Sequence, residues 1–161
     1  LYFKYINIFK AARESNEMDI DEFLKGCEKL VKSKTGALFI IERNNSLDFI
    51  RNTGDNLYLE ISSPIIESIF YKNSPLHDGA VILDGNFITA ARVVLPVSEN
   101  KNIDSRLGLR HRAAFGITEK TDAIAIVISE ENSQITFVKN GEIFEYKNID
   151  QLKTMIEAEL V

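Results

Sequence analysis

The clearest periodic pattern of apolar side chains predicts an amphipathic helix that follows Asp19. The apolar residues recur at positions i, i+3, i+4 and i+7 as far as Val31, and Asp19 can cap the first turn. Residues 1–13 also place apolar side chains at helix-like spacing, before a polar run interrupts it. We therefore divide the chain into an N-terminal helical or linker segment, residues 1–18, and one domain, residues 19–161.

Apolar runs in the rest of the chain predict strands that alternate with helices. The continuous run over 37–41 is typical of a strand covered by helices on both faces of a sheet. Further strands are expected at 57–61, 80–83, 87–95, 123–128, 135–138 and 143–146, with hairpin turns at Asp84-Gly85 and Asn140-Gly141. Helices are expected over 63–70, from Asp104 or Ser105 to about Phe115, and over 149–160. This order predicts a single α/β domain with a central mixed β-sheet flanked by helices.

Composition excludes several classes of function. The net charge of −5 over 161 residues argues against general nucleic-acid binding, which needs a broad basic face. The sequence contains no apolar run of membrane-spanning length, so we expect no membrane contact by this segment itself. The single cysteine, Cys27, cannot form an internal disulfide, and its amphipathic surroundings favour a buried structural thiol in a reducing compartment.

Both histidines of the chain lie in charged clusters. His77 precedes Asp78, Gly79 and an apolar run that begins at Ala80; composition alone favours a loop-capping aspartate beside a partly exposed histidine. The second cluster is Arg110-His111-Arg112, for which a solvated helix face and a phosphate site are equally good interpretations. Successive side chains point about 100° apart on a helix, so these three cannot share one face.

Two further clusters are predicted to lie near strand ends. Thr53-Gly54 forms a loop, and Ser129-Glu130-Glu131 follows a predicted strand. The glutamates alone would be solvent-facing, but one of them together with Asp78 could complete an oxygen-ligand site for Mg²⁺ or Mn²⁺. Walker, Rossmann, serine-elbow and zinc-ligand patterns are absent from the sequence. The residues themselves therefore indicate a carboxylate, a divalent cation and a polyphosphate, but no particular reaction.

At Asp78-Gly79-Ala80 and Arg110-His111-Arg112 the sequence resembles the bacterial diadenylate cyclase domain. The resemblance includes Gly36-Ala37-Leu38, Thr53-Gly54 and Leu95-Pro96 and covers about residues 20–160. It is strongest to the membrane-anchored cyclases, whose soluble domain follows transmembrane helices. Residues 19–161 would then be a cytoplasmic catalytic domain, and Leu1 would mark a cut below a missing anchor.

The resemblance implies an enzyme that condenses two ATP molecules into cyclic di-AMP and releases two pyrophosphates. It implies a face-to-face homodimer and a divalent metal, Mg²⁺ or Mn²⁺. The implied catalytic residues are Asp78, Gly79, Ala80, Arg110, His111 and Arg112. The implied nucleotide-binding residues are Gly36, Thr53, Gly54, Leu95, Leu109, Arg110, Arg112 and Ser129. The implied metal ligands are His77, Asp78 and Glu131.

Two positions depart from the pattern of this family. Leu109 stands where a hydroxyl residue is common, and Val94 stands where the anchored cyclases often carry an aromatic residue near the adenine. We expect altered nucleotide affinity from these changes. The alternative functions are a catalytically silent module that binds ATP or cyclic di-AMP, and a scaffold domain. The intact Asp78 beside an intact Arg-His-Arg triplet argues against the silent module.

Overall fold

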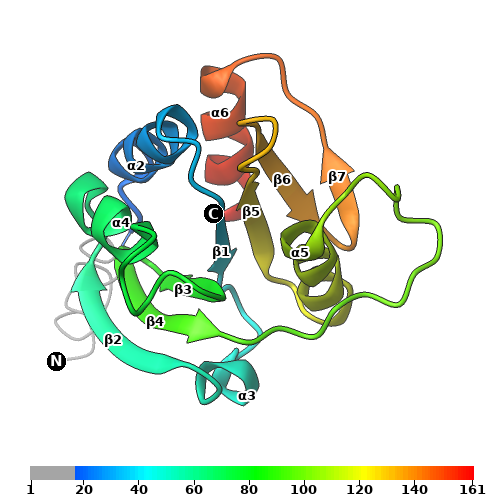
Figure 1. Cartoon of the computed structure of the whole chain (residues 1–161), viewed down its shortest axis with the longest axis horizontal. Coiled ribbons are helices and arrows are strands. Elements are labelled where there is room, and N and C mark those ends of the chain that lie inside the picture. Colours follow the sequence, from blue (N-terminus) through cyan, green and yellow to red (C-terminus); the bar gives the residue numbers. More distant parts are fainter. Residues whose placement is uncertain (1–16) are drawn as a thin grey trace, which may run out of the picture.

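The computed structural model describes residues 17–161, so the helix expected over residues 1–13 lies outside the described part (Figure 1). Seven strands form one sheet in the order β2-β4-β3-β1-β5-β6-β7. The strands are β1 (Ala37–Ile41), β2 (Asp55–Glu60), β3 (Ala80–Asp84), β4 (Phe87–Val93), β5 (Ile124–Ile128), β6 (Ile135–Lys139) and β7 (Glu142–Phe144). The helices are α2 (Ile20–Lys32), α3 (Asp48–Arg51), α4 (Ser63–Phe70), α5 (Leu109–Lys120) and α6 (Ile149–Glu159). A mixed sheet flanked by helices confirms the predicted α/β domain.

The strand register brings several chain segments to one end of the sheet. β1 runs parallel to β3 and antiparallel to β5, and β4 runs antiparallel to both β2 and β3. Consequently the starts of β1, β2 and β3 and the ends of β4 and β5 meet at the same end, which we call the motif end. The Cα partners Ala37 and Ile128, and Ala80 and Val93, mark it.

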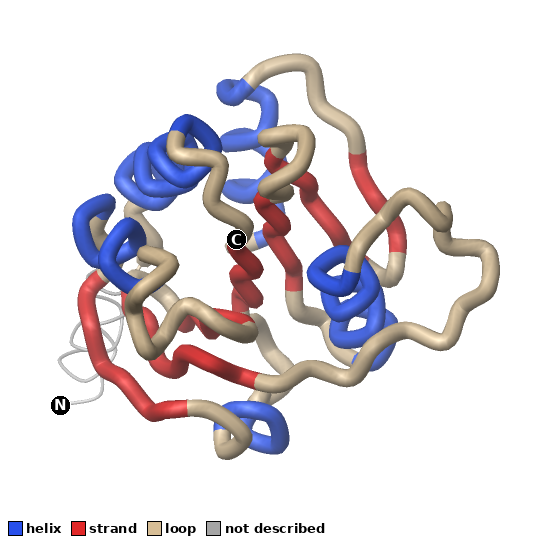
Figure 2. Tube along the Cα trace, viewed as in Figure 1, coloured by secondary structure: helices blue, strands red, loops and turns tan. Residues whose placement is uncertain are grey.

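Helices cover both faces of this sheet (Figure 2). One core lies between the sheet and α2, α4 and α6, and a second core lies between the sheet and α3 and α5. Every residue of β1 is buried, as the continuous apolar run predicts. Phe39 of β1 packs edge-on against Phe23 and Phe70, at ring-centroid distances of 5.0 and 5.1 Å. The side chains of β1 alternate between the two cores, so packing on both faces of the sheet fixes this central strand and makes it a firm base for the motif end.

Most helix boundaries follow the capping signals in the sequence. The Asp19 side chain accepts a hydrogen bond from the Glu22 N–H and caps α2, as predicted. Cys27 of this helix is fully buried, and burial raises the pKa of its thiol, which confirms a structural cysteine. Within residues 17–161, no helix has the length and apolar character needed to span a bilayer.

The start predicted for α5 is wrong. The helix begins at Leu109 after Gly108, instead of at Asp104 or Ser105, and it continues to Lys120. The Asp104 carboxylate accepts the Arg106 N–H at 2.9 Å, and the Asp104 carbonyl accepts the Leu107 N–H at 3.0 Å, so the capping signal closes a turn. The four-residue helix α3 was not predicted, and β4 ends at Val93, before the predicted 95.

Candidate nucleotide site

A cavity of about 660 Å³ opens at the motif end of the sheet. Its wall is formed by the starts of β1 and β3, the end of β4, the start of α5 and the loop after β5. The residues that line it are Leu38, Gly79, Ala80, Val93, Val94, Leu95, Val97, Arg106, Leu107, Gly108, Leu109, Arg110, His111, Ala113, Val127, Ile128, Ser129, Glu130, Glu131 and Asn132. This volume is typical of a small-molecule site.

Arg110 is held between two other wall segments. An added Cβ at Gly36 would lie only 2.3 Å from Arg110 Nη1, so the guanidinium lies directly on the glycine backbone before β1. Arg110 Nη1 is also 3.7 Å from Glu130 Oε1, in the loop after β5. The first turn of α5 thus presents a cation at a position set by contacts from two strand ends.

The Arg-His-Arg triplet divides between the cavity and the rest of α5. Arg110 and His111 line the cavity, whereas Arg112 does not. His111 is 8% exposed, and its pKa is lowered first by burial and second by the charge of Arg110. The Arg112 carbonyl accepts the Ser98 N–H at 3.0 Å. As expected for consecutive helix positions, the three side chains do not all face the cavity.

Asp78 lies on the loop before β3, at the rim of the cavity. Its side chain is 87% exposed, and its Oδ1 is 3.3 Å from His77 Nε2. Gly79 follows with φ of +84°, and a Cβ there would lie 2.7 Å from the Val93 carbonyl oxygen. The glycine therefore allows this loop to approach the end of β4 and places Asp78 beside the cavity.

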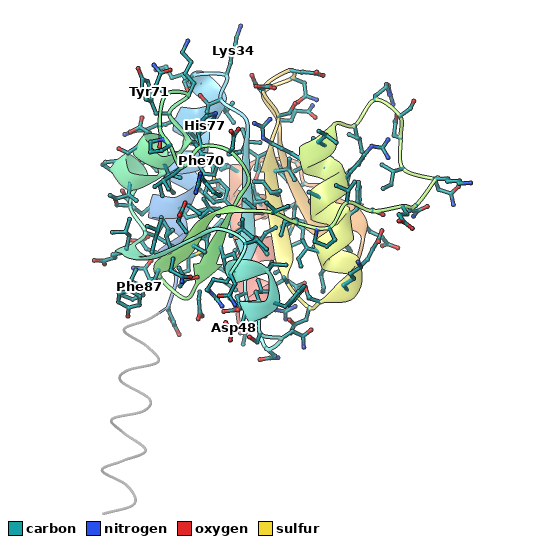
Figure 3. All side chains as sticks on the ribbon, turned by 60° about the horizontal axis from the view of Figure 1, so that its bottom comes forward. Lys34, Asp48, Phe70, Tyr71, His77 and Phe87 are labelled. Carbon is teal, nitrogen blue, oxygen red and sulfur yellow. The ribbon has the colours of Figure 1, made fainter. Side chains whose placement is uncertain are left out.

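The pair of His77 and Asp78 suits a cation. His77 Nδ1 lies 2.7 Å from the Ser74 carbonyl oxygen, which can only accept, so Nδ1 carries the proton. Nε2 then faces the Asp78 carboxylate at 3.3 Å, so a cation could bind to both groups. Figure 3 shows His77 on the same side of the molecule as Lys34, which precedes β1, and opposite Asp48.

Glu131 is separate from that pair. It lines the cavity in the loop after β5, where Ser129 Oγ accepts the N–H groups of Glu131 at 3.3 Å and Asn132 at 3.4 Å. Across residues 17–161, no three His, Cys, Asp or Glu side chains form a ready metal site. The structure therefore brings together two of the three predicted ligands, and Ser129 fixes the turn that carries the third.

Thr53 and Gly54 do not line the cavity but hold the backbone segment that does. Thr53 Oγ1 accepts the Val94 N–H at 2.9 Å and donates to the Ile50 carbonyl at 2.6 Å. A Cβ at Gly54 would lie 2.3 Å from the Ala91 carbonyl oxygen. Both residues thereby hold the end of β4, where Val94 and Leu95 line the cavity.

Further residues of the cavity wall lie in the segment between β4 and α5. Arg106, which belongs with Arg110, His111 and Arg112 to a cationic cluster suited to a small anionic ligand, lines the cavity, and so does Val97, which no sequence pattern indicated. Glu130, considered only as a possible metal ligand, instead pairs with Arg110. Their place in the sequence could have indicated these residues, since they lie between or beside the recognised motifs.

Several known proteins are similar to this chain in sequence. The family described as "DisA bacterial checkpoint controller nucleotide-binding" matches residues 24–143. The cyclic di-AMP synthase CdaA of Bacillus subtilis is 41% identical over 146 residues, which are 91% of this chain and 54% of that relative. A diadenylate cyclase of Listeria monocytogenes is 41% identical over 149 residues, 92% of this chain and 54% of the relative. The chain thus spans about half the length of these relatives.

Solved structures confirm the fold. The crystal structure of a double mutant of DacA from Staphylococcus aureus superposes with a TM-score of 0.83 at 33% identity, covering 88% of this chain and 94% of that chain. A protein from Bacillus cereus described as a hypothetical membrane spanning protein gives a TM-score of 0.77 at 38% identity, covering 85% and 68%. The family match extends over most of the chain and includes both motifs that meet at the cavity, so the chain belongs to the diadenylate cyclase (DAC) family.

Proposed function

We propose that this chain is the catalytic domain of a diadenylate cyclase, which joins two ATP molecules into cyclic di-AMP and releases two pyrophosphates. One observation carries the proposal: the Asp78-Gly79-Ala80 loop and the start of α5 meet at one nucleotide-sized cavity although they are distant in sequence. The names of the relatives support the same reaction.

The shape of the product argues for two subunits. The cavity at the motif end has room for one nucleotide, whereas cyclic di-AMP contains two nucleotides related by a two-fold axis. Two chains that face each other would each present the α-phosphorus that the 3′-hydroxyl of the other nucleotide attacks. Such an isologous face-to-face dimer is the simplest assembly that closes the ring.

The residues of the cavity fit the roles that this reaction needs. Arg110, fixed by Gly36 and Glu130, would bind phosphate oxygens and offset the charge that develops on the leaving pyrophosphate. Asp78 would accept the proton of the attacking 3′-hydroxyl. His111, kept neutral by its lowered pKa, would line the site as a hydrogen-bonding group.

His77 and Asp78 would hold a divalent cation, with Glu131, in the loop after β5, as a further candidate. Mg²⁺ and Mn²⁺ commonly bind through one or two protein groups and complete their coordination with phosphate and water, which matches the paired donors here. When bound, the cation would reduce the negative charge of the triphosphate.

We further propose that residues 19–161 form the catalytic domain and residues 1–18 an N-terminal helical or linker segment, with the domain in the cytoplasm as part of an anchored protein. The relatives that extend to about twice the length of this chain support a longer parent protein.

Product formation tests the proposal. The chain incubated with ATP and Mn²⁺ or Mg²⁺ should yield cyclic di-AMP, detected by its mass. Asp78→Asn should reduce turnover by at least about a hundredfold and leave ATP binding measurable. Asp84→Asn removes an exposed carboxylate at the far end of β3 and should behave as wild type. ATP binding without product in the wild type would instead identify a silent binding module.

A further inference from the structure

The segment that follows β4 lies flat against α5. A Cβ at Gly116 would be only 2.1 Å from the Pro96 carbonyl oxygen and 3.0 Å from the Ser98 nitrogen. Figure 1 shows this segment passing along α5 before the chain turns outward and returns to the start of the same helix. Any larger residue at position 116 would therefore push the segment away from α5.

Ser98 binds the segment to α5 through both its backbone N–H and its side-chain hydroxyl. Its N–H donates to the Arg112 carbonyl at 3.0 Å, and its hydroxyl donates to Glu119 Oε1 at 2.7 Å. The hydroxyl also accepts the Asn100 N–H at 3.2 Å. Ser98 is 8% exposed, one of four buried polar or charged residues in the described chain. A buried hydroxyl with both donor and acceptor contacts fixes the register of this segment on the helix.

Glu119 is itself held in place by the hairpin turn between β6 and β7. A Cβ at Gly141 would lie 2.7 Å from Glu119 Cγ, and the Gly141 N–H donates to Thr118 Oγ1 at 3.0 Å. The glutamate thus has a packed stem and one carboxylate oxygen directed at Ser98. The hydrogen bond from Ser98 to Glu119 therefore joins the segment after β4 to a side chain of α5 that is itself held in place.

These contacts act on both walls of the cavity. Leu95 and Val97 line one wall, on either side of Pro96, while Arg110 and His111 line the other from α5. Because Ser98 and Gly116 set how closely the segment approaches α5, they also set the separation of these walls. A loss of the contact would move the apolar wall while leaving Arg110 and the Asp78 loop in place.

We propose that Ser98, Gly116 and Glu119 are positioning residues that fix the width of the nucleotide cavity and thereby its affinity for ATP. This inference rests on the proposed nucleotide site. None of the three touches the reacting atoms, so their effect belongs to binding and not to the chemical step.

Kinetic constants and calorimetric ATP binding test this inference. Ser98→Ala and Glu119→Ala should each weaken ATP binding and raise KM about tenfold, with kcat within about threefold of wild type. Glu119→Gln keeps an oxygen that can accept the Ser98 hydroxyl and should restore wild-type affinity. Glu99→Ala changes the exposed neighbour of Ser98 and should leave the Kd for ATP unchanged. Gly116→Ala wedges the segment outward and should weaken binding more than Ser98→Ala.

Three results would overturn the inference: unchanged ATP affinity in folded Ser98→Ala and Glu119→Ala, a fall in kcat at constant KM, or equal losses in Glu119→Gln and Glu119→Ala. If Gly116→Ala does not fold, the Ser98 and Glu119 variants still decide whether the inference is correct. Calorimetry needs no turnover, so a wild type that binds ATP without forming product would refute the proposed cyclase and still test the positioning residues.

Discussion

Replacing Gly36 with alanine tests whether the position of Arg110 matters for turnover. The new Cβ would lie 2.3 Å from Arg110 Nη1 and 2.5 Å from Cζ. An ordinary carbon contact is about 3.5 Å, so the guanidinium would have to shift by about 1 Å. A misplacement of about 1 Å at a catalytic group can cost about a hundredfold in rate, which corresponds to about 2.7 kcal/mol of transition-state stabilisation.

The same substitution should leave the fold intact. The atoms that must move are the flexible far end of an arginine, and the backbone at Gly36 is not in the left-handed region. Alanine also reduces the conformational entropy of the unfolded chain relative to glycine. We therefore expect the free energy of unfolding, measured with urea, to change by less than about 1 kcal/mol.

Initial rates of cyclic di-AMP formation give kcat/KM for Gly36→Ala, Arg110→Ala and the double variant. If the methyl group acts only by displacing the guanidinium, adding Gly36→Ala to Arg110→Ala should have no further effect. Wild-type kcat/KM in Gly36→Ala, or additive losses in the double variant, would refute the assignment of Gly36 as the support of Arg110.

Three further predictions concern stability. The pKa of His111 lies below its ordinary value of 6.5, so the unfolded chain binds a proton at this histidine at a higher pH than the folded chain does, and the free energy of unfolding falls as the pH drops below about 6.5. In His111→Gln, urea unfolding at pH 7.5 and 5.5 should show a smaller difference in stability than in the wild type. Cys27→Ser places a hydroxyl in the apolar core and should cost about 1–3 kcal/mol, and thiol reagents should label Cys27 only on unfolding. Thr53→Ala leaves the Val94 N–H without its acceptor and should cost about 1–2 kcal/mol, whereas Thr53→Ser should retain the contact; equal unfolding midpoints for the two variants would contradict this role.

Periodicity predicted the elements far better than it predicted their meeting point. The apolar runs were sufficient to predict β1 and α2. A strand buried on two faces is a continuous apolar run, and a helix buried along one stripe has apolar residues at helical spacing. The position of β1 between β3 and β5 depends on long-range pairing, which no local pattern encodes. The clusters at strand ends indicated a site with a carboxylate and a polyphosphate, but the pairing of the Asp78 loop with the start of α5 was specified only by the resemblance to a family.

The errors have a common physical cause. Asp104 carries the signal of a helix cap, yet its carboxylate binds the Arg106 N–H within a turn, and α5 starts at Gly108 without a side-chain cap. Thr53 was expected in the cavity wall, whereas its hydroxyl is used by the backbone of Val94. In both cases a short polar side chain has several local partners, and only the tertiary structure selects among them.

The two chemical halves of the cavity rest on supports of unequal rigidity. Arg110 lies in the first turn of α5, a helix packed on β1 and β5, the most deeply buried strands, so displacement of its backbone would require disruption of the core. Asp78 projects into solvent from a loop that can open locally at little free-energy cost. In the proposed reaction the backbone of α5 would keep its position, while the Asp78 loop would adjust to an incoming ion or nucleotide.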